Sequence, residues 1–268
     1  MPMNQYDLTD FEWRAIQPHL PNKPRGVPRV DDRRVLNGIF WVLRSGARWA
    51  DLPARYGPPT TIYNRFNRWR KAGVWDRLMD AVTKAHDGKV QMIDTSIVRV
   101  HQQGANGKKG DRNHCLGRSR GGLTTKIHAL VDAKGRPIKL MLTAGQMSDI
   151  ASAAADLITE LPEGAMLLAD KGYDANALRN AVTERRAWAN IPPKANRKDP
   201  ICFSAFLYKA RNLVERFFNK AKQFRRIATR YDKLAENYLA ALKLVSVRIW
   251  LRDNESSCNL WLLPSGLG

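Results

Sequence analysis

The chain has 268 residues and carries 45 lysines and arginines against 25 aspartates and glutamates, which gives a formal net charge of +20. This length is enough for a sizeable hydrophobic core in one large or two modest domains, and the charge indicates a polyanionic partner. No apolar run approaches the ~20 residues of a membrane span, and residues 1–21 lack the apolar stretch of a signal peptide, so we expect a soluble, cytoplasmic protein with no membrane partner.

Residues 1–85 are predicted to form a small, separate helical domain. Asp32 precedes a helix whose apolar residues recur at helical spacing until Gly46. After a tight, proline-containing turn, Thr60 is a good N-cap for a second helix, which is expected to stop at Gly73. The pattern of helix, turn and helix is typical of a helix-turn-helix module.

The second of these helices has two chemically different faces. Ile62, Phe66 and Trp69 share an apolar face. The opposite face carries basic, amide and hydroxyl side chains, which are candidates for contacting DNA: Thr61, Asn64, Arg65, Arg68 and Lys71. An ordinary helical hairpin with a solvated face is the alternative, but the net charge favours a DNA-binding interpretation.

Two buried strands are each expected to end in an acidic residue. Asp94 follows the apolar run Val90–Ile93, and Asp170 follows Ala165–Ala169; both runs are too short for a typical helix. Ligands of open α/β sheets gather outside the carboxyl ends of parallel strands. If the two strands are neighbours, the carboxylates of Asp94 and Asp170 lie side by side.

The segments around these strands predict a mixed α/β arrangement. A β-hairpin is expected with Gly135 in its loop, followed by a helix from Ser148 or Asp149, a further helix and a last strand. Their predicted ranges are 125–131 and 138–142 for the hairpin, 148–161 and 174–186 for the helices, and 188–191 for the strand. Basic residues gather in the Gly-rich segment 99–126 and again over 209–233.

A third acidic residue lies in a helical pattern that contains neither glycine nor proline, from Tyr208 to Lys222. On a helix that turns ~100° per residue, four of its side chains fall within a wedge of roughly 60°. They are Tyr208, Arg211, Glu215 and Lys222. Arginine forks onto phosphate oxygens, lysine acts as a point charge, and a carboxylate is a hard ligand for Mg²⁺. A solvated charged face is the alternative for this helix taken alone.

Converging carboxylates raise one another's pKa unless a cation lies between them. The two strand acids and Glu215 together therefore predict a site for a divalent metal ion. Glu215 would then share that ion with Asp94 and Asp170.

With these residues in view, the chain resembles the bacterial insertion-sequence transposases of the DDE class. Within that class it is similar to the group whose third acid lies on a Tyr-x-x-Arg-x-x-x-Glu-x-x-x-x-x-x-Lys helix, which residues 208–222 match without a gap. The sequence Asp170-Lys171-Gly172-Tyr173 matches the group's usual context for the second acid, and Asp94 fits the first. The resemblance covers roughly residues 1–250.

The resemblance implies an RNase H-like catalytic domain over residues 86–252, with a mixed five-stranded sheet and flanking helices. The small all-α, helix-turn-helix-like domain precedes it, and residues 253–268 are expected to form a loosely ordered tail. The short spacing between the last strand and Glu215 excludes the large subdomain that some relatives insert there.

The resemblance also implies an activity, namely metal-dependent cleavage and strand transfer of the ends of an insertion sequence. Asp94, Asp170 and Glu215 would hold two Mg²⁺ ions, for which Mn²⁺ can substitute, while Tyr208, Arg211 and Lys222 grip DNA phosphates. The implied partners are the terminal inverted repeats and the target, both double-stranded DNA, within a homodimeric complex at the bacterial nucleoid.

Two other functions remain open at this point. One is a structure-selective nuclease of the same fold that does not join strands, and the other is a catalytically silent DNA-binding regulator. The intact acids argue against the regulator.

Overall fold

The computed structural model describes residues 6–21, 31–105, 114–119, 121–148, 154–198 and 200–261. The chain divides into two compact units. Unit 1 comprises Met1–Lys84, Gln223–Ile227 and Ala240–Gly268, and unit 2 comprises Ala85–Lys222 and Ala228–Leu239. Residues 240–252, which were expected in the catalytic segment, lie in unit 1.

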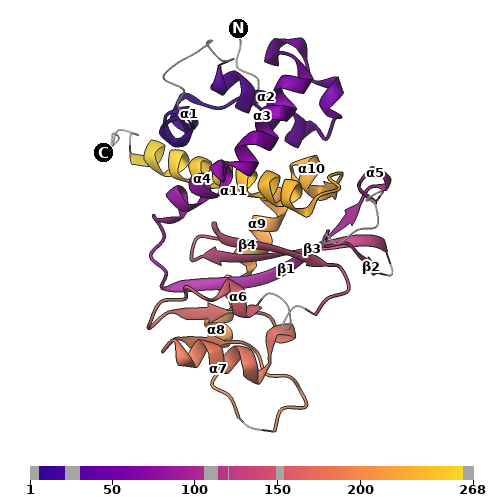
Figure 1. The fold of residues 1–268 in the computed structure, drawn as a ribbon. Coiled ribbons are helices and arrows are strands. Elements are labelled where there is room, and N and C mark those ends of the chain that lie inside the picture. Colours follow the sequence, from indigo (N-terminus) through magenta and orange to yellow (C-terminus); the bar gives the residue numbers. More distant parts are fainter. Residues whose placement is uncertain are drawn as a thin grey trace, which may run out of the picture. The chain divides into compact units, whose positions relative to one another are not determined.

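The described part of unit 1 is helical (Figure 1). Its elements, with η for a short 3-10 helix, are α1 (Asp10–Ile16), η1 (Gln17–His19), α2 (Asp32–Ser45), η2 (Trp49–Asp51), η3 (Ala54–Tyr56), α3 (Pro59–Lys71), α4 (Val74–Thr83), most of α10 (Arg225–Ala228) and the larger part of α11 (Ala235–Trp261). Aromatic and aliphatic side chains from both ends of the sequence form its core, among them Phe40, Phe66, Trp75, Leu244 and Trp250.

Local sequence explains the ends of the predicted helices. The backbone of Gly46 is left-handed, with a φ of 78°, and closes α2 as expected. Thr60 is not the N-cap of α3, because the helix begins one residue earlier, at Pro59. Proline suits the first helical position, where its missing N–H has no intrahelical partner to lose and its φ is already helical.

The C-terminal segment differs from the expected loose tail. Helix α11 continues through residues 253–261, so these residues are helical, whereas residues 262–268 lie outside the described part of the chain. None of the helices in the described part of the chain combines the length and hydrophobicity needed to cross a lipid bilayer.

Seven strands form one mixed sheet in the described part of unit 2: β1 (Val90–Val100), β2 (Gly117–Ser119), β3 (Gly122–Asp132), β4 (Pro137–Ala144), β5 (Met166–Leu168), β6 (Trp188–Asn190) and β7 (Thr229–Arg230). Five of them run in the order β4–β3–β1–β5–β6, with antiparallel pairs among the first three and parallel pairs among the last three. The short β2 pairs with β3, and β7 pairs with β1. The expected hairpin is β3–β4, and the fold is RNase H-like.

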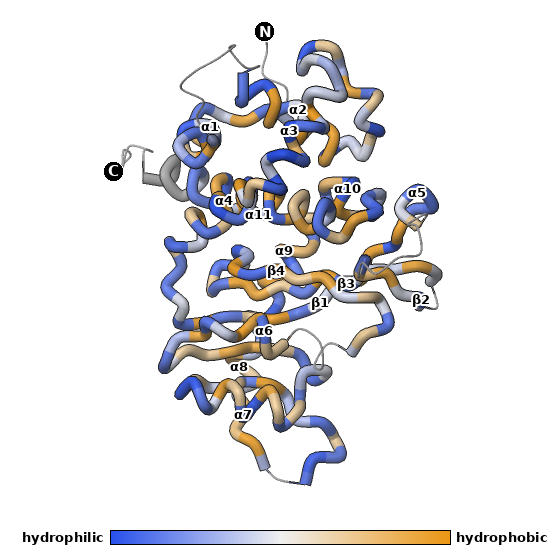
Figure 2. Tube along the Cα trace, viewed as in Figure 1, coloured by the Kyte–Doolittle hydropathy of each residue, from blue (hydrophilic) through white to orange (hydrophobic). Residues whose placement is uncertain are grey.

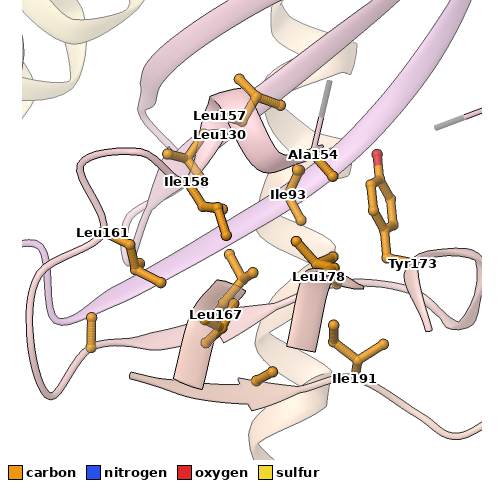
Figure 3. Packing of buried hydrophobic residues seen from close by; sticks show 14 residues of the cluster. Ile93, Leu130, Ala154, Leu157, Ile158, Leu161, Leu167, Tyr173, Leu178 and Ile191 are labelled. Carbon is orange, nitrogen blue, oxygen red and sulfur yellow. The ribbon is translucent and has the colours of Figure 1, made fainter. Parts of the chain in front are cut away.

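Helices cover both faces of this sheet. They are α5 (Gln102–Ala105), α6 (Ala155–Leu157), η5 (Lys171–Tyr173), α7 (Asn176–Glu184), α8 (Ala205–Tyr208), η6 (Lys209–Arg211) and α9 (Asn212–Lys222). One face packs against α6 and α7 through a buried cluster that includes Ile93, Leu130, Leu167 and Leu178 (Figure 3). Helix α9 packs on β1 and β3. Figure 2 shows the hydrophobic segments of the central strands and the hydrophilic segment that follows β6.

Three expectations for unit 2 change in detail. Asp94 lies inside β1 rather than at its end, because β1 continues to Val100 while paired with β3. The segment from Tyr208 to Lys222 is helical but is divided by the tighter turn η6. In the described residues, the helix expected over 148–161 appears only as α6, and Ser148 is not helical. Residues 149–153, and much of the basic Gly-rich segment (residues 106–113 and 120), lie outside the described residues.

Candidate active site

Parallel pairing brings the two strand acids together. Met92 on β1 lies beside Leu168 on β5, so the same register two residues further on places Asp94 beside Asp170. Alternation along β1 turns Ile93 toward the buried cluster and Asp94 toward the opposite face. The sequence prediction that these two strands are neighbours is confirmed.

The carboxylate of Asp94 is largely buried and fully hydrogen-bonded. Its Oδ1 accepts from the backbone N–H of Thr95 at 2.8 Å, and its Oδ2 accepts from Nη1 of Arg211 at 2.7 Å. Burial raises the pKa of Asp94; the Thr95 N–H and the charge of Arg211 oppose that rise, and the charge of Asp170 adds to it. The mutual repulsion expected of two neighbouring acids is therefore present.

Asp170 offers an oxygen that no described residue satisfies. This residue lies at the N-cap position of η5, and its Oδ1 is buried without a hydrogen-bond partner in the described part of the chain. Gly172 leaves the space around that atom open, because a Cβ at residue 172 would lie 2.9 Å from Oδ1 of Asp170. A buried carboxylate oxygen without a partner is unfavourable unless something else binds it.

Glu215 reaches the site through an arginine. Its Oε1 accepts from Nη2 of Arg211 at 2.7 Å, so the guanidinium lies between the carboxylates of Asp94 and Glu215. The side chain of Glu215 is 54% exposed, compared with 15% for Asp94. Among the described residues, no group of three acidic, histidine or cysteine side chains is close enough to hold a metal ion together. The structure thus brings Asp94 and Asp170 together, and ties Glu215 to them by way of Arg211.

The other predicted residues of this helical segment also point to the site. Arg211 lies over the ring of Tyr208, with 5.7 Å between the guanidinium carbon and the ring centroid. Nζ of Lys222 donates to Oγ of Ser96 at 2.6 Å. Ser96 was not among the residues predicted for the site. The sequence did contain a signal for Ser96. A residue two positions after Asp94 in a strand lies on the same face as Asp94.

The DNA-facing side predicted for α3 needs one correction. Asn64, Arg68 and Lys71 are exposed and Thr61 is half-buried, as a solvent-facing surface requires. Arg65 is instead buried, and its Nη1 donates to Oδ1 of Asp32 at 2.5 Å. The side chain of Arg65 lies between the apolar face and the outer face of α3, where it pairs with Asp32 of α2.

The donor set fits a hard divalent cation. Carboxylate oxygens are the ligands that Mg²⁺ and Mn²⁺ prefer, and the unpartnered Oδ1 of Asp170 lies next to the buried Asp94. Arg211 already supplies one positive charge to the same cluster. Because Oδ1 of Asp170 still has no partner in the described part of the chain, the cluster can accept a further cation in addition to Arg211.

Comparisons with known proteins identify the family of the chain. Residues 8–79 match a family described as putative transposase of IS4/5 family, and residues 85–250 match the transposase DDE domain family. A putative transposase for insertion sequence element IS6501 from Brucella ovis is 37% identical over 131 residues, which are 48% of this chain and 100% of that protein. An uncharacterized protein, y4sN, from Sinorhizobium fredii is 38% identical over 109 residues, 39% of this chain and 87% of its own length.

Among solved structures, the piggyBac transposase synaptic complex with hairpin DNA matches with a TM-score of 0.49 and 11% identity, covering 93% of this chain and 72% of that one. The family match that includes Asp94, Asp170 and Glu215 covers more than half of the chain. The chain therefore belongs to the transposase DDE domain family.

Proposed function

We propose that this DDE transposase cleaves the ends of an insertion sequence and joins them to target DNA at a site formed by Asp94, Asp170 and Glu215. The observation that supports this most directly is the pairing of β1 with β5, which sets Asp170 and its unpartnered oxygen beside Asp94. The family uses divalent metal ions. For this chain we propose two Mg²⁺ ions, with Mn²⁺ as a substitute.

The bound ions would supply the activation of a water or a DNA 3′-hydroxyl and the stabilisation of the leaving oxygen. The protein supplies the rest. Asp94 is fixed by the Thr95 N–H and by its place inside a paired strand, so one ligand is rigid before binding. Asp170 contributes the open oxygen, and Glu215, which is more exposed, would complete the set from α9.

Arg211 has two possible positions in the proposed site: paired with the carboxylates of Asp94 and Glu215, or displaced from them by a metal ion. Its guanidinium neutralises Asp94 and Glu215, the same carboxylates that a divalent ion needs. The arginine and the ion therefore compete for these oxygens. Once displaced, the guanidinium is free to fork onto a DNA phosphate. The role that the motif implies for Arg211 thus belongs to the state in which the metal is bound.

We propose that double-stranded DNA from the terminal inverted repeats and from the target is the substrate. Tyr208, Arg211 and Lys222 would hold the phosphates next to the scissile bond, and the exposed residues of α3 would contact the element end. Joining two ends requires two active sites, so we propose a homodimer in the DNA complex. The +20 charge favours all of these contacts.

The test replaces Asp170 with asparagine and follows nicking and strand transfer on a labelled duplex that carries one end of the element. We expect at least a 10³-fold loss of both reactions with DNA affinity retained, because the variant loses a metal ligand while the basic surface is intact. Asp156→Asn, on α6 in the same unit, is the matched control. Near-normal nicking by Asp170→Asn in Mg²⁺ would overturn the proposed site, and cleavage without joining by the wild type would indicate the nuclease alternative.

A further inference from the structure

In the described part of the chain, two neutral oxygens hold the ammonium group of Lys222. Its Nζ donates to Oγ of Ser96 at 2.6 Å and lies 3.5 Å from the carbonyl oxygen of Ile97. Within the described part of the chain, no carboxylate pairs with it. Burial lowers the pKa of Lys222. A half-buried cation without an acidic partner is suited to receive an anion from outside the protein.

Strand geometry places this contact beside the carboxylate cluster. Ser96 follows Asp94 by two positions on β1, so both side chains lie on the same face of the sheet. Asp94 binds Arg211 and Ser96 binds Lys222. Arg211 and Lys222 are thus attached to neighbouring, same-facing positions of a single strand.

We propose that Ser96 is a positioning residue for DNA cleavage, which fixes the direction in which Lys222 presents its charge to a phosphate of the bound strand. The Ser96 hydroxyl accepts one of the three ammonium hydrogens and the Ile97 carbonyl a second at longer range, which leaves at least one for a phosphate oxygen. This inference rests on the proposed role of Lys222 in gripping DNA. It adds a residue that the Tyr-Arg-Glu-Lys pattern does not contain.

A lysine needs such a partner because its four-carbon stem is flexible. Held at a fixed point, the ammonium group keeps the scissile phosphate in line for attack; released, it still attracts DNA but no longer aligns it. Loss of the hydroxyl is therefore expected to lower the cleavage rate more than the affinity. That combination differs from the effect of damage to the fold, which lowers both.

The experiment measures single-turnover cleavage of a labelled element-end duplex at saturating protein, together with the dissociation constant for the same duplex. Ser96→Ala is expected to cleave about tenfold more slowly while its Kd rises by less than about twofold, since one hydrogen bond to a charged group is lost. Ser96→Thr, which keeps the hydroxyl, is expected to restore most of the rate. The double variant Ser96→Ala, Lys222→Ala is expected to match Lys222→Ala alone, because Ser96 acts through Lys222.

The control is Ser119→Ala, which removes another hydroxyl of the same sheet, one that donates to the carbonyl of Gly122, and should leave the rate unchanged. If Ser96→Ala fails to fold, Ser96→Cys keeps the size of the side chain but offers a weaker acceptor, and slow cleavage by that variant supports the same conclusion. Full-rate Ser96→Ala beside a slow Lys222→Ala would overturn this inference alone. A further slowing of Lys222→Ala by Ser96→Ala would do the same. Full-rate Lys222→Ala would overturn the proposed role of Lys222 itself.

Discussion

The absence of a side chain at Gly172 leaves room for the carboxylate of Asp170, a proposed metal ligand. A Cβ at this position would lie 2.9 Å from Oδ1 of Asp170 and 3.6 Å from its Oδ2. Contacts under 3.0 Å force a displacement, and here the atom displaced is the proposed ligand itself. The Gly in the Asp-x-Gly-Tyr sequence thus has a steric explanation in this structure.

We expect Gly172→Ala to reduce cleavage by at least about tenfold, because a shift of the Asp170 carboxylate misplaces the metal. Stability should change by no more than about 1 kcal/mol, since the substitution removes no contact and the effect is confined to one side chain. The measurement is the cleavage rate together with a thermal melt. Gly121→Ala is the comparison, since its nearest neighbour, Nη2 of Arg99, would lie at 3.6 Å. Equal rates for the two variants would contradict the steric explanation.

Arg211 leads to a prediction about metal binding that does not depend on activity. Its guanidinium pairs with both Asp94 and Glu215, so its removal leaves two acids without their cation. We expect Arg211→Ala to bind Mn²⁺ about tenfold more tightly than the wild type, which corresponds to about 1.4 kcal/mol of relieved competition. Isothermal titration calorimetry without DNA measures this directly. The exposed Arg216 of the same helix provides the control Arg216→Ala, and unchanged Mn²⁺ affinity in Arg211→Ala would show that the arginine and the metal do not compete.

At the scale of elements, two of the arginines of α3 have opposite roles. Arg65 and Asp32 are 9% and 10% exposed and form an ion pair that joins α3 to α2. Arg68, about one turn further along, is exposed. The first arginine holds the helical unit together, and the second is available for DNA.

We expect Arg65→Ala to destabilise unit 1 by about 3 kcal/mol, because it removes a buried cationic partner of the Asp32 carboxylate. Arg68→Ala should leave the melting temperature unchanged and weaken DNA binding, with a flatter dependence of affinity on salt. Circular dichroism melts and binding titrations at several salt concentrations test both variants. A stable Arg65→Ala protein, or an Arg68→Ala protein with wild-type affinity and salt dependence, would contradict this division.

The elements also show what the sequence could and could not predict. Short apolar runs located β5 and most of β6, which ends at Asn190. The polar sequence Asp94-Thr95-Ser96 interrupts the apolar run of β1, so the second half of the strand, which pairs with β3, was not predicted. Arg65 lies at the border between two faces of α3. Its side chain is buried because it pairs with Asp32 on α2, and the sequence of α3 alone does not predict that pairing.

The candidate site shows the same limit. The three acids follow from local motifs, but the insertion of Arg211 between Asp94 and Glu215 depends on how α9 packs against β1. Side-chain spacing on one helix placed Arg211 and Glu215 together. It carried no information on the distance of either from Asp94.

For the molecule as a whole, the main lesson is that unit 1 is built from distant parts of the sequence. Arg248 on α11 is buried, and its Nε donates to Oε1 of Glu12 at 3.0 Å, while Glu12 is fully buried. Arg248 also donates to the backbone oxygens of Tyr6 and Asp7, at 2.7 and 2.6 Å. The order of motifs along the sequence did not predict this pairing of α1 with α11, because neither helix carries a local pattern that identifies the other.

We expect Arg248→Ala to destabilise unit 1 by about 3 to 5 kcal/mol, since it leaves the buried Glu12 without its main cation. Arg252→Ala is the matched control, because Arg252 also pairs with Glu12 at 3.1 Å but is 49% exposed, and it should cost less than about 1 kcal/mol. Urea unfolding followed by tryptophan fluorescence compares the two. Similar losses for both variants would show that burial does not set the strength of this pair.

The same pairing has a consequence for biosynthesis. Residues 1–84 leave the ribosome first, but the residues that complete their core and neutralise Glu12 are translated only after residues 85–222. At about 5 to 20 residues per second, the wait lasts roughly ten seconds or more. We therefore expect a chain that stops before Arg248 to lack the buried ion pair that stabilises unit 1. The stable helical unit would then form only after most of unit 2 has been synthesised.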